Sequence, residues 1–225
     1  MNLIDQALAF LTDPMNWTGT TGIPQRMLEH LGYTALTMAI ALIIAVPLGL
    51  WVGHTGRGSG VVVGITGALR SLPTLGLLTL FTLLMGLGLL PPILALVLLA
   101  IPPILSGTYS GVASVSPALV DGARAMGMTE RQTLTRVEIP VALPVILGGI
   151  RNAALQVLAT VTIVAYINLG GLGRYLIDGL AVRDYSRMLA SVVLVAVLAL
   201  AADGILALIQ RLVTSPGLRL AGERS

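Results

Sequence analysis

The stretch that decides the fold runs from Asp121 to Pro140 and reads DGARAMGMTERQTLTRVEIP. It is charged and rich in helix-forming residues, whereas the whole chain is 56% hydrophobic and only 10% charged. A chain of that composition cannot form one soluble core with a wetted surface, so an integral membrane protein is predicted. The charged stretch must then lie in water beside the bilayer.

Apolar segments flank this stretch, and each is long enough to cross a bilayer. The first, Leu31–Val52, would form a helix of roughly 33 Å. The second is interrupted by Arg70, Ser71 and Pro73, and we expect it to form one long kinked helix rather than two short pieces. The fold class is therefore all-α, with about five membrane-spanning helices, at residues 31–52, 61–89, 91–111, 144–169 and 188–213.

The domain organisation and the orientation follow from these spans. Residues 1–30 are expected to form a short extracytoplasmic segment, residues 31–213 the transmembrane domain, and residues 214–225 a cytoplasmic tail. Within the domain, residues 114–140 form a polar hairpin, which is placed inside because short cytoplasmic loops collect arginine. Seven arginines then lie inside (Arg57, Arg124, Arg131, Arg136, Arg211, Arg219, Arg224) and four outside (Arg26, Arg174, Arg183, Arg187). A multi-pass protein of the cell membrane with an external N-terminus is predicted.

Several classes of chemistry find no support in the sequence. There is no cysteine, and the two isolated histidines, His30 and His54, do not have metal-ligand spacing. The arginines sit at the ends of segments rather than in one basic block, which argues against nucleic acid as a partner. The glycine-rich GHTGRGSG stretch lacks the Gly-Lys-Ser/Thr ending that phosphates need, and the chain has no lysine. We therefore expect no catalytic residues, no metal and no cofactor bound by this chain.

The polar hairpin is expected to contain two short helices, over residues 121–127 and 129–136. Thr129 is placed to cap the second helix and Pro140 to end it. Such a hairpin serves either as a docking surface for a soluble partner or as a solvated loop that covers the ends of the spans. Composition alone leaves these two interpretations equal.

The spacing within the hairpin resembles the EAA signature of ABC importer permeases, which is Glu-Ala-Ala, three residues, Gly, nine residues, then Ile-x-Leu-Pro. Asp121 stands where that family usually has Glu, which shortens the reach of the carboxylate by one methylene. Gly122 stands where it usually has Ala, which costs about 1 kcal/mol of helix propensity. The positions that correspond to the signature are Asp121, Gly122, Ala123, Gly127, Val137, Ile139 and Pro140.

Further segments resemble the osmoprotectant branch of the type I importer permeases, which handles glycine betaine, choline, carnitine and proline. They are LRSLPTLGLL, LPPILALVLLAIPPI, EIPVALPVILGGIRNA and NLGGLGRYL. The RSLP and GGLG patterns are shared with the methionine-type permeases, so they indicate the fold more firmly than the solute. Import of methionine or another amino acid is the first alternative. A membrane enzyme or an assembly factor outside the ABC class is the second, but no catalytic constellation accompanies it.

The resemblance implies a complex. Two ATPase subunits, which hold the ATP and Mg²⁺, would dock on the hairpins, an extracytoplasmic binding protein would deliver the solute, and a second permease copy or paralogue would complete the pathway. Asp121 and Glu130 are the acids expected to pair with basic groups on the ATPase, and Gly127 would allow a close approach or a tight turn.

Polar residues within the spans are candidates for the solute path, because ionisable groups seldom face lipid. Arg70 and Ser71 head this set. Asn152, Gln156 and Thr160 recur at four-residue spacing and form one stripe along a helix. The equal alternative for this stripe is hydrogen bonding that joins neighbouring spans.

Overall fold

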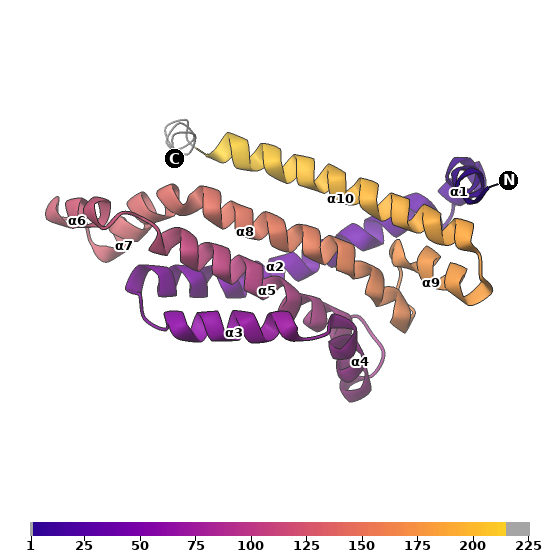
Figure 1. The fold of residues 1–225 in the computed structure, drawn as a ribbon, viewed down its shortest axis with the longest axis horizontal. Helices are drawn as coiled ribbons and strands as arrows, with labels where there is room; N and C mark the ends of the chain where they lie inside the picture. Colours follow the sequence, from indigo (N-terminus) through magenta and orange to yellow (C-terminus); the bar gives the residue numbers. More distant parts are fainter. Residues whose placement is uncertain (1, 215–225) are drawn as a thin grey trace. The chain divides into compact units, whose positions relative to one another are not determined.

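The computed structural model describes residues 2–214, and throughout this range the regular secondary structure is helical (Figure 1). Residues 215–225 lie outside the described part, and with them Arg219, Arg224 and most of the expected tail. The helices are α1 (Leu3–Thr12), η1 (Pro14–Trp17), α2 (Ile23–Thr55), α3 (Ser59–Ser71), α4 (Thr74–Met85), α5 (Leu90–Ala113), α6 (Pro117–Ala125), α7 (Glu130–Thr133), η2 (Leu134–Glu138), α8 (Ile139–Thr160), η3 (Val161–Ile167), α9 (Gly173–Val182) and α10 (Tyr185–Val213).

Four helical stretches in the described part are long and apolar enough to cross a membrane: α2, α5, the continuous run from Glu130 to Ile167, and α10. The pair α3 and α4 makes a fifth if it is counted as one broken span. This agrees with the prediction of about five spans. The helices extend beyond the predicted apolar limits: α2 begins at Ile23, and α9 occupies part of the predicted polar loop at residues 170–187.

The expectation of one long kinked helix over residues 61–89 is wrong. Helix α3 ends at Ser71, α4 starts at Thr74, and the two are bent by 85°. Pro73 explains the break, because it lacks a backbone N–H and its ring disfavours helical backbone angles at the residue before it, Leu72. Pro73 itself has an extended backbone (ψ 114°) and stands at the N-cap of α4.

The expectation that Pro140 ends the second hairpin helix is also wrong. The helix that begins at Glu130 passes through a π-helical turn, η2, and continues as α8 without a break. In this turn the backbone N–H of Ile139 donates to the carbonyl of Leu134, five residues back. The shift in hydrogen-bond register just before Pro140 lets the helix accept a residue that has no N–H. The fourth span therefore begins before the predicted Pro144.

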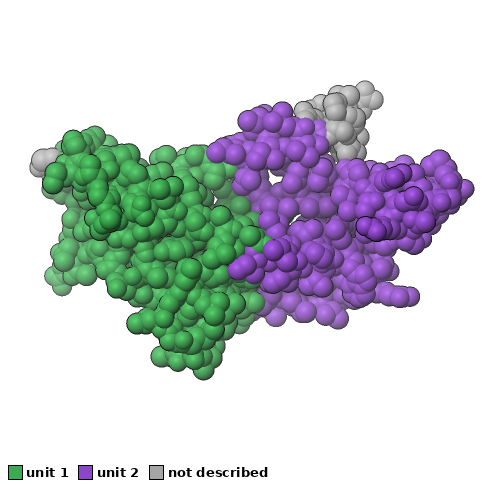
Figure 2. Space-filling view, turned by 180° about the vertical axis from the view of Figure 1, so that it is seen from behind, with its two compact units in different colours: residues 1–39, 72–99, 154–203 green, residues 40–71, 100–153, 204–225 purple. Residues whose placement is uncertain are grey.

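The chain divides into two compact units (Figure 2). The first comprises residues 1–39, 72–99 and 154–203, and the second comprises residues 40–71, 100–153 and 204–225. In the first unit, the Tyr175 hydroxyl donates to the carbonyl of Thr21 at 2.6 Å, and the Phe10 ring meets the Tyr175 ring edge-on. Glu29 accepts the backbone N–H of Gly171 at 2.7 Å, so α2 holds the loop before α9.

In the second unit, α2, α5 and α8 pack closely at glycines. A Cβ added to Gly53 of α2 would lie 2.7 Å from the Cβ of Val112 on α5, and one on Gly149 of α8 would lie 2.7 Å from the carbonyl oxygen of Pro103 on α5. Small residues allow membrane helices to approach in this way. The same unit contains a buried apolar cluster of Val112, Val115, Ala142 and Ile146. Val120 and Leu134 of the polar hairpin pack against this cluster.

Candidate functional site

The turn of the polar hairpin is built on Gly127. Helix α6 ends there in a Schellman motif, in which the N–H of Gly127 donates to the carbonyl of Arg124 and the N–H of Met128 donates to the carbonyl of Ala123. Gly127 has a φ of +83°, a left-handed conformation that side chains with a Cβ disfavour. The glycine that the sequence pattern singled out is therefore required by the backbone of the turn.

The second half of the hairpin starts with a capping box. The Thr129 side chain accepts the N–H of Gln132 at 3.3 Å, and the Gln132 side chain accepts the N–H of Thr129 at 2.9 Å. This confirms the prediction that Thr129 caps the second helix. The reciprocal bonds satisfy two donors that the first turn of a helix leaves free, and so they fix where α7 begins.

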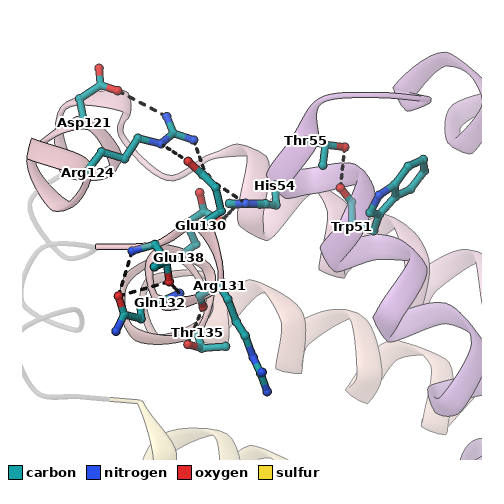
Figure 3. Close-up of polar contacts among 11 residues, drawn as sticks. Trp51, His54, Thr55, Asp121, Arg124, Glu130, Arg131, Gln132, Thr135 and Glu138 are labelled. Carbon is teal, nitrogen blue, oxygen red and sulfur yellow. Dashed lines mark hydrogen bonds and ion pairs between the residues drawn. The ribbon is translucent and has the colours of Figure 1, made fainter. Parts of the chain in front are cut away.

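An ion pair joins the two halves of the hairpin (Figure 3). Arg124 of α6 donates to both oxygens of Glu130 of α7, from Nε at 3.0 Å and from Nη2 at 2.9 Å. The Nη1 atom of Arg124 lies 3.6 Å from Asp121. The hydrogen bonds to the Glu130 carboxylate raise the pKa of the Arg124 guanidinium, which is therefore charged at any physiological pH. Two-pronged pairs of this kind fix geometry as well as charge.

A histidine from a distant part of the chain completes the cluster. His54 lies at the end of α2, and its Nδ1 is 2.6 Å from Oε2 of Glu138, while its Nε2 is 3.2 Å from Oε2 of Glu130. Glu138 is buried, with 4% of its surface exposed, and the His54 side chain is 13% exposed. Figure 3 shows the imidazole between the two carboxylates.

Sequence reasoning missed both His54 and Glu138 as members of this site. For Glu138 a signal existed, because it stands four and eight residues before Ala142 and Ile146, which are buried on the same face of the helix. A carboxylate on a buried face needs a partner. For His54 no local signal existed, since its partners lie more than 70 residues away in the sequence.

The structure brings the predicted hairpin residues together but gives them different surroundings. Ala123 is buried, with 1% of its surface exposed, while Val137 and Ile139 are half-buried. Asp121, Gly122, Gly127 and Pro140 are exposed, as is Glu130, although its carboxylate is engaged by Arg124 and His54. Two exposed hydrophobic residues, Leu119 of α6 and Met126 at its C-cap, also lie in the hairpin.

The predicted path residues occupy two places. Arg70 and Ser71 are exposed at the end of α3, and the Ser71 hydroxyl donates to the carbonyl of Ala68 at 2.7 Å. On α8, Asn152 and Gln156 are exposed, and the half-buried Thr160 donates to the carbonyl of Gln156 at 2.7 Å. Within the described residues, no group of three His, Cys, Asp or Glu side chains is arranged to hold a metal ion.

Apolar helices long enough to cross a membrane, with a structured polar hairpin between two of them, are typical of a multi-pass membrane protein. The chain belongs to the family described as binding-protein-dependent transport system inner membrane component, which matches residues 41–215. The family predicted from the hairpin pattern is therefore confirmed.

Relatives within this family carry informative names. The chain is 35% identical over 191 residues to the glycine betaine/carnitine/choline transport system permease protein OpuCB of Bacillus subtilis (strain 168), which covers 85% of this chain and 88% of that one. It is 33% identical over 197 residues to the choline transport system permease protein OpuBB of the same organism, and the match covers 88% of this chain and 91% of that one. It is 36% identical over 196 residues to the osmoprotectant import permease protein OsmW of Salmonella typhimurium (strain LT2), covering 85% and 91%.

Solved structures confirm the fold class. An inward-facing structure of the MetNI methionine ABC transporter matches with a TM-score of 0.76 at 23% identity, over 91% of this chain and all of that one. An amino acid ABC transporter solved with histidines matches with a TM-score of 0.67 at 22% identity, over 84% of this chain and 92% of that one. The chain therefore has the all-helical fold of importer permeases, as the sequence predicts.

Proposed function

We propose that this chain is the membrane-spanning permease subunit of an ATP-driven importer for an osmoprotectant such as glycine betaine, choline, carnitine or proline. The observation that carries this proposal is the 35% identity over 191 residues to a glycine betaine/carnitine/choline permease. Other relatives of 33–36% identity are named for choline or osmoprotectants. These names favour osmoprotectants over methionine, for which the structural likeness at 23% identity supports the fold alone.

The polar hairpin is the proposed docking site for a separate ATPase subunit, which would hold the ATP and Mg²⁺. The chain contains no lysine and so lacks the phosphate-binding loop that hydrolysis would need. Leu119 of α6 and Met126 at its C-terminal end are 52% and 75% exposed and offer an apolar contact, while the exposed carboxylate of Asp121 lies on the opposite side of the helix. A partner with an apolar pocket and a basic rim fits this surface.

The hairpin can transmit force because it is internally tied. The Arg124–Glu130 pair holds α6 against α7, and α7 continues without a break into α8. Closure of an ATPase dimer would therefore move the hairpin and a span together, which is how alternating access is driven in such a machine. The complex would also hold a second permease copy or paralogue, two ATPase subunits and an external binding protein, with the hairpin and the C-terminus of this chain in the cytoplasm.

The solute path is proposed to include Arg70, Ser71 and the α8 stripe of Asn152, Gln156 and Thr160. Asn152 and Gln156 are exposed in the single chain, so they are free to face a path formed with a second permease subunit. Neutral polar side chains suit a zwitterion or a weakly hydrated quaternary amine, and selectivity would be left to the binding protein.

The test is uptake by a strain that lacks this gene and its redundant systems. At high osmolarity, we expect the deletion to impair uptake of glycine betaine, choline, carnitine or proline, and expression of the chain to restore it. Unchanged uptake of all four solutes, together with lost methionine uptake, would contradict the proposal and favour the amino-acid alternative.

A further inference from the structure

Helix α2 reaches the acidic residues of the polar hairpin through the side chain of His54. Both ring nitrogens of His54 face carboxylate oxygens, Nδ1 that of Glu138 at 2.6 Å and Nε2 that of Glu130 at 3.2 Å. A neutral imidazole has a single N–H and would direct a lone pair at one of the two carboxylates. His54 therefore lies where a ring N–H can donate to either glutamate, and it bridges η2 and α7 to the end of α2.

The burial of Glu138 gives its contact with His54 an energetic role. A carboxylate that is 4% exposed needs a cation or several donors to compensate for its lost hydration. The charged and titratable groups that face the cluster come from both halves of the hairpin and from α2. From α6 to α2 they are Asp121, Arg124, Glu130, His54 and, behind His54 on η2, Glu138, with separations of 3.6, 2.9, 3.2 and 2.6 Å.

The end of α2 that carries His54 is held firmly by its own packing. Gly53, the preceding residue, lies against Val112 of α5, and Gly49, one turn earlier, lies against Thr108 of the same helix. Because this end of α2 is packed against α5, His54 cannot move with the hairpin while α2 stays in place. A displacement of Glu130 and Glu138 would either pull α2 along or break their contacts with His54.

We propose that His54 is a positioning residue that transmits movement of the polar hairpin to α2. The hairpin also passes its movement to α5 and α8, because it is continuous with both helices in the chain. His54 would not contact the ATPase itself, because both of its nitrogens are occupied within the chain. This inference rests on the proposed function, since it presumes that an ATPase moves the hairpin.

The experiment compares variants in the complete importer, reconstituted in liposomes with its ATPase and binding protein. The readout is the ratio of glycine betaine transported to ATP hydrolysed, measured beside the yield of assembled complex. We expect His54→Ala to lower this ratio at least about threefold, within the range of coupling between directly contacting charged residues. The matched control is Thr55→Ala, since the Thr55 hydroxyl bonds locally to the carbonyl of Trp51 and lies outside the cluster.

A double variant separates positioning from simple stabilisation. His54→Ala leaves the buried Glu138 without its side-chain partner, which by itself can reduce assembly, and adding Glu138→Gln replaces that buried carboxyl group with a neutral amide. We expect the double variant to recover yield but to keep the low transport ratio. Recovery of both would show that His54 only compensates for the burial of Glu138, and a normal ratio in His54→Ala would likewise overturn the inference. If the unaltered complex shows no ATP-driven uptake, the proposed function itself fails.

Discussion

At the scale of single residues, Gly127 shows how a sequence pattern reports a backbone requirement. The turn between α6 and α7 needs a left-handed residue at this position, and the two hydrogen bonds of the Schellman motif form only around it. A Cβ at Gly127 would have no atom within 4 Å beyond Gly127 itself and the residues next to it in the chain. The demand is therefore conformational rather than steric.

We predict that Gly127→Leu weakens docking of the ATPase without preventing membrane insertion. A non-glycine residue in the left-handed region costs roughly 1–2 kcal/mol, so the hairpin would shift its turn or populate open forms. The measurement is the amount of ATPase that co-purifies with the variant, together with uptake. Gly122→Ala is the matched control, because Gly122 is helical and exposed and a Cβ there meets no atom within 4 Å. Co-purification and uptake of Gly127→Leu at the parent level would show that the hairpin is only a loop.

The same scale shows where sequence reasoning stops. The cap at Thr129 and the glycine turn are local, so their signals lie within a few residues and could be predicted. The cluster around His54 depends on α2 and η2 lying together in the folded chain, a contact that joins residues 84 positions apart. Nothing in the neighbourhood of His54 in the sequence indicates it, because a lone histidine near the end of an apolar helix fits many surroundings.

At the scale of elements, the spans could be predicted but not their breaks and continuations. Both wrong predictions about where a helix breaks concern a proline. Pro73 divides a predicted span into α3 and α4, whereas Pro140 does not stop the helix that runs from Glu130. The difference arises because a π-helical turn precedes Pro140 and supplies a shifted hydrogen bond, while Pro73 adopts an extended backbone. A single sequence does not contain this information, since it depends on how each helix is packed.

Close packing of α5 on α8 gives the prediction at this scale. A Cβ on Gly149 would lie 2.7 Å from the carbonyl of Pro103 and 2.9 Å from the Cα of Gly107, and these are backbone atoms that cannot rotate away. We predict that Gly149→Ala lowers the thermal stability of the purified chain in detergent, at a cost of about 1–3 kcal/mol for overpacking.

The adjacent glycine provides a control for that prediction. A Cβ on Gly148 would meet only the end of the Gln210 side chain, at 4.0 Å, so Gly148→Ala should leave the melting temperature unchanged. Equal melting temperatures for Gly149→Ala and the parent chain would mean that α5 and α8 do not pack at these glycines.

At the scale of the whole molecule, the composition, the fold and the family all indicate a membrane-spanning permease. The hydrophobic composition predicts a membrane protein, the described helices include four long apolar ones and a bent pair, and the family match covers residues 41–215. The relatives named for choline, carnitine and glycine betaine support the proposed solute class.

One measurement tests the central claim most directly, and it is ATP-driven uptake into liposomes that contain the purified chain. The liposomes would be prepared with and without the ATPase that co-purifies from the native membrane, with the cognate binding protein and labelled glycine betaine outside and ATP inside. We predict no ATP hydrolysis by the chain alone and uptake only when the chain, the ATPase, the binding protein and ATP are all present. Robust ATP hydrolysis by the isolated chain, or equal uptake without the ATPase, would contradict the account.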